Sequence, residues 1–127
     1  MQGEHFDWSN VKISGKLYAC DLSYLASMLR RQTDCATIDL SDVKIILSDN
    51  SKQNSYTYLQ DGQECTDVMS SADVIPESMF ESCTSLIRMI LPASLKQIGN
   101  RAFYGSSLLT IDIPQSVERV GRQAFQG

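Results

Sequence analysis

The last part of the chain contains a repeated pattern of residues. Residues 75–97 align with residues 98–119, and residues 120–127 begin a third copy, at intervals of 23 and then 22 residues. A period of this length indicates stacked supersecondary units whose apolar faces form one continuous core. The predicted core positions recur from one copy to the next: Ile75, Ile98 and Val120; Phe80, Phe103 and Phe125; Leu86 and Leu108; Met89 and Ile111; Leu91 and Ile113.

Each copy contains an expected strand that ends at a proline. In residues 87–91 and 109–113, inward and outward positions alternate as in a half-buried strand. Pro92 and Pro114 follow directly, and proline has no amide hydrogen with which to continue a sheet. We therefore expect short rungs of equal length. The side chains predicted to face inward are Ile87, Met89, Leu91, Leu109, Ile111 and Ile113.

The chain is expected to turn back toward the core between one rung and the next. Gly99 and Gly121 are predicted to occupy tight turns, because glycine tolerates a positive φ. A short helical turn then places Phe80, Phe103 and Phe125 between neighbouring coils. One buried ring per coil predicts an aromatic spine.

The repeat I-P-x-x-x-F-x-x-C-x-S-L-x-x-x-x-L-P-x-S-L-x-x-I-G-x-x-A-F, at residues 75–103, resembles the BspA-type leucine-rich repeat of bacterial surface proteins. The resemblance covers residues 75–127, but the second copy departs from it at Gly105-Ser106 and is one residue shorter, which puts the packing near Tyr104 in question. It implies an α/β fold, a short leucine-rich-repeat solenoid of parallel β rungs with an N-terminal cap that contains a helix. It also implies a non-catalytic protein, extracellular or on the cell surface, whose export signal has been removed.

Residues 11–45 resemble the cap region that precedes the repeats in many relatives. Val11 and Ile13 alternate as in a strand, and the next apolar positions have the spacing of an amphipathic helix. Residues 36–42 resemble the rung at 109–115 and are interpreted as a degenerate first rung. The inward positions are Leu22, Leu25, Ala26 and Leu29 on the helix, and Ile38 and Leu40 on the rung.

We expect one structural domain in three parts. Residues 1–47 form the cap with its helix and first rung, residues 48–73 a long polar surface loop, and residues 74–127 two nearly complete repeats and a truncated third. The loop is far longer than the usual connection of about 4–6 residues. Within it, Asp61-Gly62 favours a turn such as that of a small hairpin. The side chains that either pin the loop to the domain or form a contact patch are Tyr56, Tyr58 and Leu59.

Charge and hydropathy narrow the classes of partner. The chain of 127 residues has a formal net charge of −4, so it lacks the positive field that nucleic-acid binding requires. It contains no run of about 18 apolar residues, the length needed for a transmembrane segment. Residues 1–20 lack the apolar segment of a signal peptide, so the protein is either cytoplasmic or has lost an export signal.

The residues that carry chemistry are few and scattered. His5 is the only histidine, and a lone histidine has no partner for a catalytic triad. Three aspartates have cation-binding oxygens but no EF-hand spacing. The four cysteines form no C-x-x-C pair, and they allow either two disulfides or buried free thiols, which we favour. We therefore predict no catalytic residue, cofactor or metal. The aspartates and cysteines are Asp39, Asp42, Asp49, Cys20, Cys35, Cys65 and Cys83.

The outer face of the expected sheet is the remaining candidate for function. Its outward residues form two short rows, and extended repeat surfaces of this kind are used for binding. We expect a protein or glycan ligand here. Alternatively, these side chains only solvate the sheet, and the chain is a spacer or the N-terminal cap of a longer repeat array. The predicted face consists of Thr37, Asp39, Arg88, Ile90, Thr110 and Asp112.

The third copy of the repeat is incomplete in this sequence. It stops shortly after Phe125, before the strand that would cover this ring. We therefore expect an exposed repeat edge. Either the chain is a fragment of a longer array, or it hides the edge by self-association.

Overall fold

The computed structural model describes residues 7–126 and has a mixed α/β architecture. Its largest sheet consists of parallel strands in the order β1-β2-β6-β8. The antiparallel strands β3 and β4 form a second sheet, and the short parallel strands β5, β7 and β9 form a third. The strands are β1 (Val11–Leu17), β2 (Ala36–Ile45), β3 (Ser55–Gln60), β4 (Gln63–Val68), β5 (Val74–Ile75), β6 (Leu86–Ile90), β7 (Gln97–Ile98), β8 (Thr110–Asp112) and β9 (Arg119–Val120).

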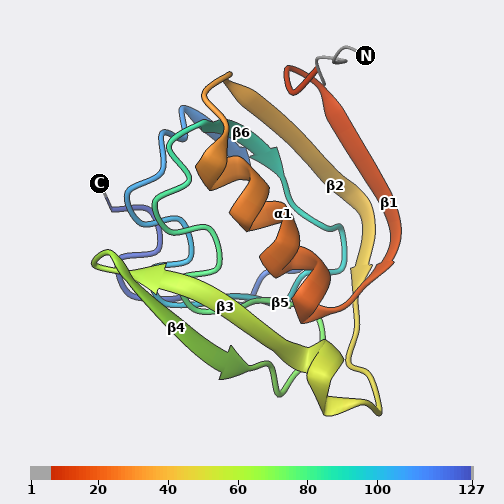
Figure 1. Ribbon diagram of the computed structural model, residues 1–127. Coiled ribbons are helices and arrows are strands. Elements are labelled where there is room, and N and C mark those ends of the chain that lie inside the picture. Colours follow the sequence, from red (N-terminus) through yellow and green to blue (C-terminus); the bar gives the residue numbers. More distant parts are fainter. Residues whose placement is uncertain (1–6, 127) are drawn as a thin grey trace, which may run out of the picture.

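The helix α1 (Ala19–Arg31) lies between the four-stranded sheet and the hairpin of β3 and β4 (Figure 1). The carboxylate of Asp21 accepts a hydrogen bond of 2.8 Å from the backbone N–H of Tyr18, which fixes the first turn. The apolar stripe predicted from the sequence is confirmed, because all four of its side chains are buried. These are Leu22, Leu25, Ala26 and Leu29.

Hydrogen bonds join the end of α1 to the first repeat. The guanidinium of Arg30 donates to the carbonyl of Glu81 at 2.9 Å and to that of Met79 at 3.1 Å. The hydroxyl of Ser85 donates to the carbonyl of Leu29 at 2.7 Å. Hydrogen bonds that involve a charged group stabilise a fold by roughly 1.5–3 kcal/mol. The helix and the repeats are thus tied together around one continuous core.

The strands of the repeats lie side by side, as the sequence predicts. Met89 on β6 is in register with Ile38 on β2 and with Ile111 on β8, and all three strands run parallel. Ile38 and Leu40 are buried, so the first rung at residues 36–42 is confirmed. Equivalent apolar side chains therefore meet across neighbouring strands, which is how the repeats build their core.

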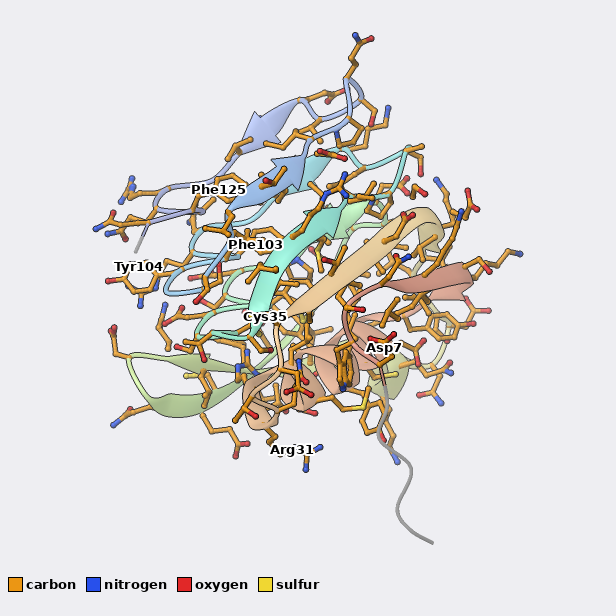
Figure 2. All side chains as sticks on the ribbon, turned by 90° about the horizontal axis from the view of Figure 1, so that it is seen from above. Asp7, Arg31, Cys35, Phe103, Tyr104 and Phe125 are labelled. Atoms are coloured by element: carbon orange, nitrogen blue, oxygen red, sulfur yellow. The ribbon has the colours of Figure 1, made fainter. Side chains whose placement is uncertain are left out.

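The phenylalanines of successive repeats stack on one another. The ring centroids of Phe80 and Phe103 are 5.4 Å apart, and so are those of Phe103 and Phe125, with interplanar angles of 12° and 7°. Figure 2 shows Phe103 and Phe125 in neighbouring turns of the chain. The predicted aromatic spine is confirmed, whereas the predicted helical turn is wrong. The residues two positions before each ring have left-handed φ angles of 56° to 57°, which interrupts a helix.

The last repeat is much less buried than the repeat before it, as expected for an exposed repeat edge, although Leu109 and Ile113 were predicted to face inward. Leu109 is 83% exposed, and Ile113, Val120 and Phe125 are 45%, 46% and 40% exposed. Their counterparts in the repeat before are covered by this last repeat, whereas the described residues contain no further strand that covers it. Ile87 is also only half-buried, because Leu86 takes the inward place at the start of β6. The alternating pattern gives the direction of a side chain, and burial depends on the neighbour.

Gly99 and Gly121 are needed for a reason that differs from the prediction. Neither residue has a positive φ. A Cβ on Gly99 would lie 2.7 Å from the backbone nitrogen of Glu77, and one on Gly121 would lie 2.5 Å from that of Asn100. Glycine therefore allows the backbones of successive repeats to approach closely at this corner.

Residues 48–73, which we expect to be a polar surface loop, contain regular structure. A short 3-10 helix (Ser51–Asn54) leads into β3, and β4 returns antiparallel to it. Asp61 and Gly62 have φ angles of 52° and 84°, so the hairpin turn suggested by these two residues is confirmed. Tyr56 is 5% exposed and belongs to the core, so it pins the hairpin to the domain.

Replacing a ring in the middle of the stack tests its contribution to stability. We expect Phe103→Ala to lower the free energy of unfolding by about 3–5 kcal/mol, because this ring is fully buried between two others. Phe125→Ala removes a ring with only one stacked neighbour, so its effect is expected to be clearly smaller. Urea denaturation of both variants measures the difference, and equal losses would contradict a stack that depends on neighbours.

The close approach at Gly121 is tested by adding one methyl group. We expect Gly121→Ala to destabilise the fold by about 1–3 kcal/mol or more, because the new Cβ collides with backbone atoms that have little room to move. Gly62→Asn is the control, since asparagine tolerates a left-handed φ and nothing lies within 4 Å of the added Cβ. Thermal unfolding measures both, and a Gly121→Ala variant as stable as the parent would refute the steric explanation.

Candidate functional site

The structure places the six predicted face residues on one side of the four-stranded sheet. Thr37, Arg88 and Thr110 are in register across β2, β6 and β8, and they form the first row. The second row consists of Asp39, Ile90 and Asp112 in the same order. None of the six is buried, whereas residues that alternate with them on β2 and β6 point into the core, namely Ala36, Ile38, Leu40 and Met89. The two rows form what we call the outer face.

Strand β1 extends the outer face beyond the predicted residues. Lys12 is exposed and is in register with Asp39, so it continues the second row to β1. Val11 and Ile13 predict this strand, but the residue between them was not among the predicted face residues. The alternation along this strand indicates that Lys12 faces outward. The parallel pairing of β1 with β2 places it at the end of the second row.

Charges of opposite sign alternate across the outer face. Arg88 Nη2 lies 3.1 Å from Asp112 Oδ2, and Lys12 Nζ lies 3.0 Å from Asp42 Oδ2. Both pairs are well exposed to solvent, where an ion pair contributes only about 0–1 kcal/mol to stability. These contacts hold the long side chains in place at the surface more than they stabilise the fold.

Asp39 lies between the two basic side chains of the outer face. Hydrogen bonds from the hydroxyl and the amide of Ser41 lower the pKa of Asp39, and the positive charges of Lys12 and Arg88 lower it further. The carboxylate is therefore ionised at neutral pH. The outer face thus has donors on Lys12 and Arg88, an acceptor on Asp39 and an apolar side chain on Ile90, a combination that is common at protein interfaces.

A hollow with a volume of about 360 Å³ lies between α1 and the hairpin. Cys20, Arg30, Tyr58 and Glu64 are among the residues that line it. Burial raises the pKa of the Cys20 thiol, so this thiol is protonated at neutral pH and is a poor nucleophile. The guanidinium of Arg30 is already engaged with two backbone carbonyls. The groups of this hollow are arranged for packing.

The remaining candidates for chemistry do not come together. His5 lies outside the described residues. No group of His, Cys, Asp or Glu within residues 7–126 is arranged to hold a metal ion, and this includes the three aspartates considered from the sequence. All four cysteines are free thiols, but only Cys83 is fully buried, and burial raises its pKa to about 12. Cys35, by contrast, is exposed.

A buried charge cluster connects the hairpin turn to the repeats. Glu81 is 1% exposed, and its carboxylate accepts hydrogen bonds from Arg101 at 3.1 and 2.8 Å and from the amide of Asp61 at 3.2 Å. Arg101 also donates to the carboxylate of Asp61 at 2.9 Å and lies 3.9 Å above the ring of Tyr104. The packing near Tyr104, which the sequence put in question, is thus set by a cation–π contact.

This cluster was not predicted from the sequence. Glu81 and Arg101 are 20 residues apart, and neither has a charged counterpart in the other repeats. Burial by itself raises the pKa of Glu81, but the hydrogen bonds from Arg101 and Asp61 outweigh burial and lower it. The cluster therefore stabilises the fold only while Glu81 is ionised.

The pH dependence of stability tests the role of Glu81. A lowered pKa in the folded state means that its contribution is complete above the unfolded-state value of about 4.3 and is lost as the pH falls below it. We expect Glu81→Gln to lower stability at pH 7 by about 1–3 kcal/mol and to flatten the decline between about pH 5 and 3. Urea titrations at several pH values measure this, with Glu118→Gln, an exposed carboxyl, as the control. An unchanged acid profile in Glu81→Gln would disprove the assignment.

Comparison with protein families agrees with this architecture. The model described as "BspA type Leucine rich repeat region (6 copies)" matches residues 36–127, which begins at β2 and so includes the first rung. No curated protein and no solved structure matches the chain. Leucine-rich repeats of this type are modules often used in protein interaction and are generally not enzymes. Among residues 7–126, no helix has the length and apolar character to cross a membrane. The chain belongs to the BspA-type leucine-rich-repeat family.

Proposed function

We propose that the chain is a non-catalytic binding module that recognises a protein or a glycan through its outer face. Its repeats form a short solenoid in this proposal, and the strands of the rungs present the binding residues. The observation that carries the proposal is the register of the six outward side chains, which places them in two adjacent rows on parallel strands. The family, whose repeats often serve in interaction, supports the same conclusion.

Arg88 and Ile90 are the centre of the proposed contact. Both lie on β6, which has β2 on one side and β8 on the other. Arginine and central apolar side chains contribute most to binding energy at interfaces, because a partner displaces water from them completely. The ion pair with Asp112 already restricts Arg88, so less side-chain entropy is lost when a partner binds.

The proposed location is the bacterial cell surface or the extracellular medium. This part of the proposal rests on the family, whose repeats resemble those of bacterial surface proteins. An adhesive role fits such a location, since an exposed sheet contacts a large partner without a deep pocket. Labelling of intact cells with a reagent that does not cross membranes tests it, and labelling only after lysis would disprove it.

A second candidate function is that of a structural cap. The helix α1 and strand β1 cover the N-terminal side of the first rung, and α1 donates hydrogen bonds to the turn of the first repeat. A repeat array requires an end of this kind to protect its core. In this alternative the outer face has no ligand, and the opposite charges on it serve only to keep the sheet soluble.

Binding measurements with matched charge variants distinguish the two functions. The chain is screened against extracellular matrix proteins and glycans, and a saturable ligand is then titrated by calorimetry. We expect Arg88→Glu to weaken binding at least about tenfold, because it reverses the charge at the centre of the outer face. Lys52→Glu makes the same change of charge on the exposed 3-10 helix and is expected to have no effect.

The outcomes separate the proposals clearly. An equal loss of affinity in both variants would mean that the ligand recognises net charge alone. Unchanged affinity in both would mean that the ligand binds elsewhere on the molecule. An absence of saturable binding across the whole screen would favour the cap. Circular dichroism of each variant confirms that the fold is retained, as expected for substitutions of exposed side chains.

A further inference from the structure

Strand β4 is the free edge of the hairpin, in the middle of the chain between the first rung and the repeats. It pairs with β3 on one side, and no other strand among the described residues pairs with its second side. Helix α1 lies against the hairpin on the side of β3, so β4 is on the outside (Figure 1). Five of its six residues are exposed, and only Cys65 is partly buried.

The two edges of the hairpin differ in how their backbone groups are satisfied. On the β3 edge, the hydroxyl of Ser23 accepts a hydrogen bond from the amide of Thr57 and donates one to its carbonyl, both at 3.0 Å. In an antiparallel pair, two residues that lie opposite each other direct their backbone groups either toward each other or both outward. Thr66 lies opposite Thr57, so its amide and carbonyl point away from β3. Helix α1 thus closes one edge, and the edge at β4 stays open.

The open backbone groups of β4 belong to Glu64 and Thr66. Residues two apart in a strand direct these groups the same way, so Glu64 shares the orientation of Thr66. The amide of Val68 also points to this edge, but the carboxylate of Asp67 accepts its hydrogen bond at 2.8 Å. An amide and a carbonyl remain on each of Glu64 and Thr66, and no hydrogen bond from another described segment reaches them.

The charges on β4 decide what kind of strand can pair with it. Exposed edge strands usually carry a proline, a lysine or a bulge that prevents further pairing. Strand β4 contains none of these, and its register with β3 is regular over its whole length. Its two charged residues, Glu64 and Asp67, are both acidic, and neither forms an ion pair with a described residue. The edge therefore repels an acidic strand and attracts a basic one.

We propose that β4 binds an extended basic segment of a partner protein, which joins the hairpin as a third strand. The amides and carbonyls of Glu64 and Thr66 supply the main-chain hydrogen bonds that give affinity in this mode of peptide recognition. Glu64 and Asp67 are three residues apart, and facing strands pair residue by residue. Two basic residues at positions i and i+3 of the segment therefore meet both carboxylates.

The exposed side chain of Val68 adds an apolar position to the same motif. Val68 is 53% exposed and follows Asp67 at the end of β4. In a segment antiparallel to β4, the residue opposite Val68 comes directly before the first basic residue. The motif is therefore an apolar residue, a basic residue, two residues with high strand propensity, and a second basic residue.

A second copy of the chain does not fit this edge. Residues 55–68, which form the hairpin, contain three acidic residues and no basic one, and the whole chain carries a net charge of −4. Two hairpins brought edge to edge would repel each other. The outer face lies on the far side of the four-stranded sheet from α1 and the hairpin, so a ligand bound there leaves β4 accessible (Figure 1).

A synthetic peptide tests the proposal. The probe Thr-Val-Lys-Thr-Val-Lys-Thr places its first valine opposite Val68 and its lysines opposite Asp67 and Glu64. We expect saturable binding of the labelled probe to the 127-residue chain, measured by fluorescence anisotropy at about 0.15 M salt. A peptide of the same composition with adjacent lysines is expected to bind at least about tenfold more weakly. No binding of the probe, or equal binding of the two peptides, would overturn the proposal.

Methylation of single peptide amides tests the main-chain hydrogen bonds. In the proposed register, the amide of the central threonine of the probe points to β4, and the amide of the valine after it points away. We expect an N-methyl group on this threonine to abolish binding and an N-methyl group on this valine to be tolerated. Equal effects of the two methyl groups would show that the probe does not pair as a strand.

Variants of the chain test the same contact from the other side. Thr66→Pro removes an outward amide without removing a hydrogen bond to β3, so it is expected to abolish binding while circular dichroism shows a retained fold. Glu64→Lys is expected to weaken binding at least about fivefold. Glu118→Lys makes the same change of charge on the last repeat and is expected to bind like the parent. A folded Thr66→Pro variant that binds the probe, or equal losses in the two lysine variants, would disprove the site at β4.

Discussion

The contact between one repeat and the next determines most of this structure. Phe103 is fully buried because a ring stacks on each side of it, whereas Phe125, with one stacked neighbour, is 40% exposed. The same dependence holds for the rungs, since Leu91 is 2% exposed and its counterpart Ile113 is 45% exposed. A single repeat therefore has no interior of its own, and its stability comes from the repeats that cover it.

The repeat at residues 75–97 has a different kind of neighbour, because the chain before it contributes the rung β2 but no phenylalanine turn. Here α1 supplies the apolar cover, and Arg30 satisfies carbonyls in the turn that carries Phe80. The hairpin adds a second layer over α1, and the pair of Glu81 and Arg101 fixes its turn against two successive repeats. Removing a charge from this cluster loosens the hairpin and the repeats together, since both depend on the same carboxylate.

The sequence was sufficient to predict features that recur at regular intervals along the chain. Alternation along β2, β6 and β8 predicted the outer face, and the recurrence of phenylalanine predicted the stack. It failed where a distant segment decides the outcome. The need for glycine at position 121 depends on the backbone at Asn100, and the pairing of Glu81 depends on a left-handed Arg101 in the next repeat. Neither of these contacts has a signature within one repeat.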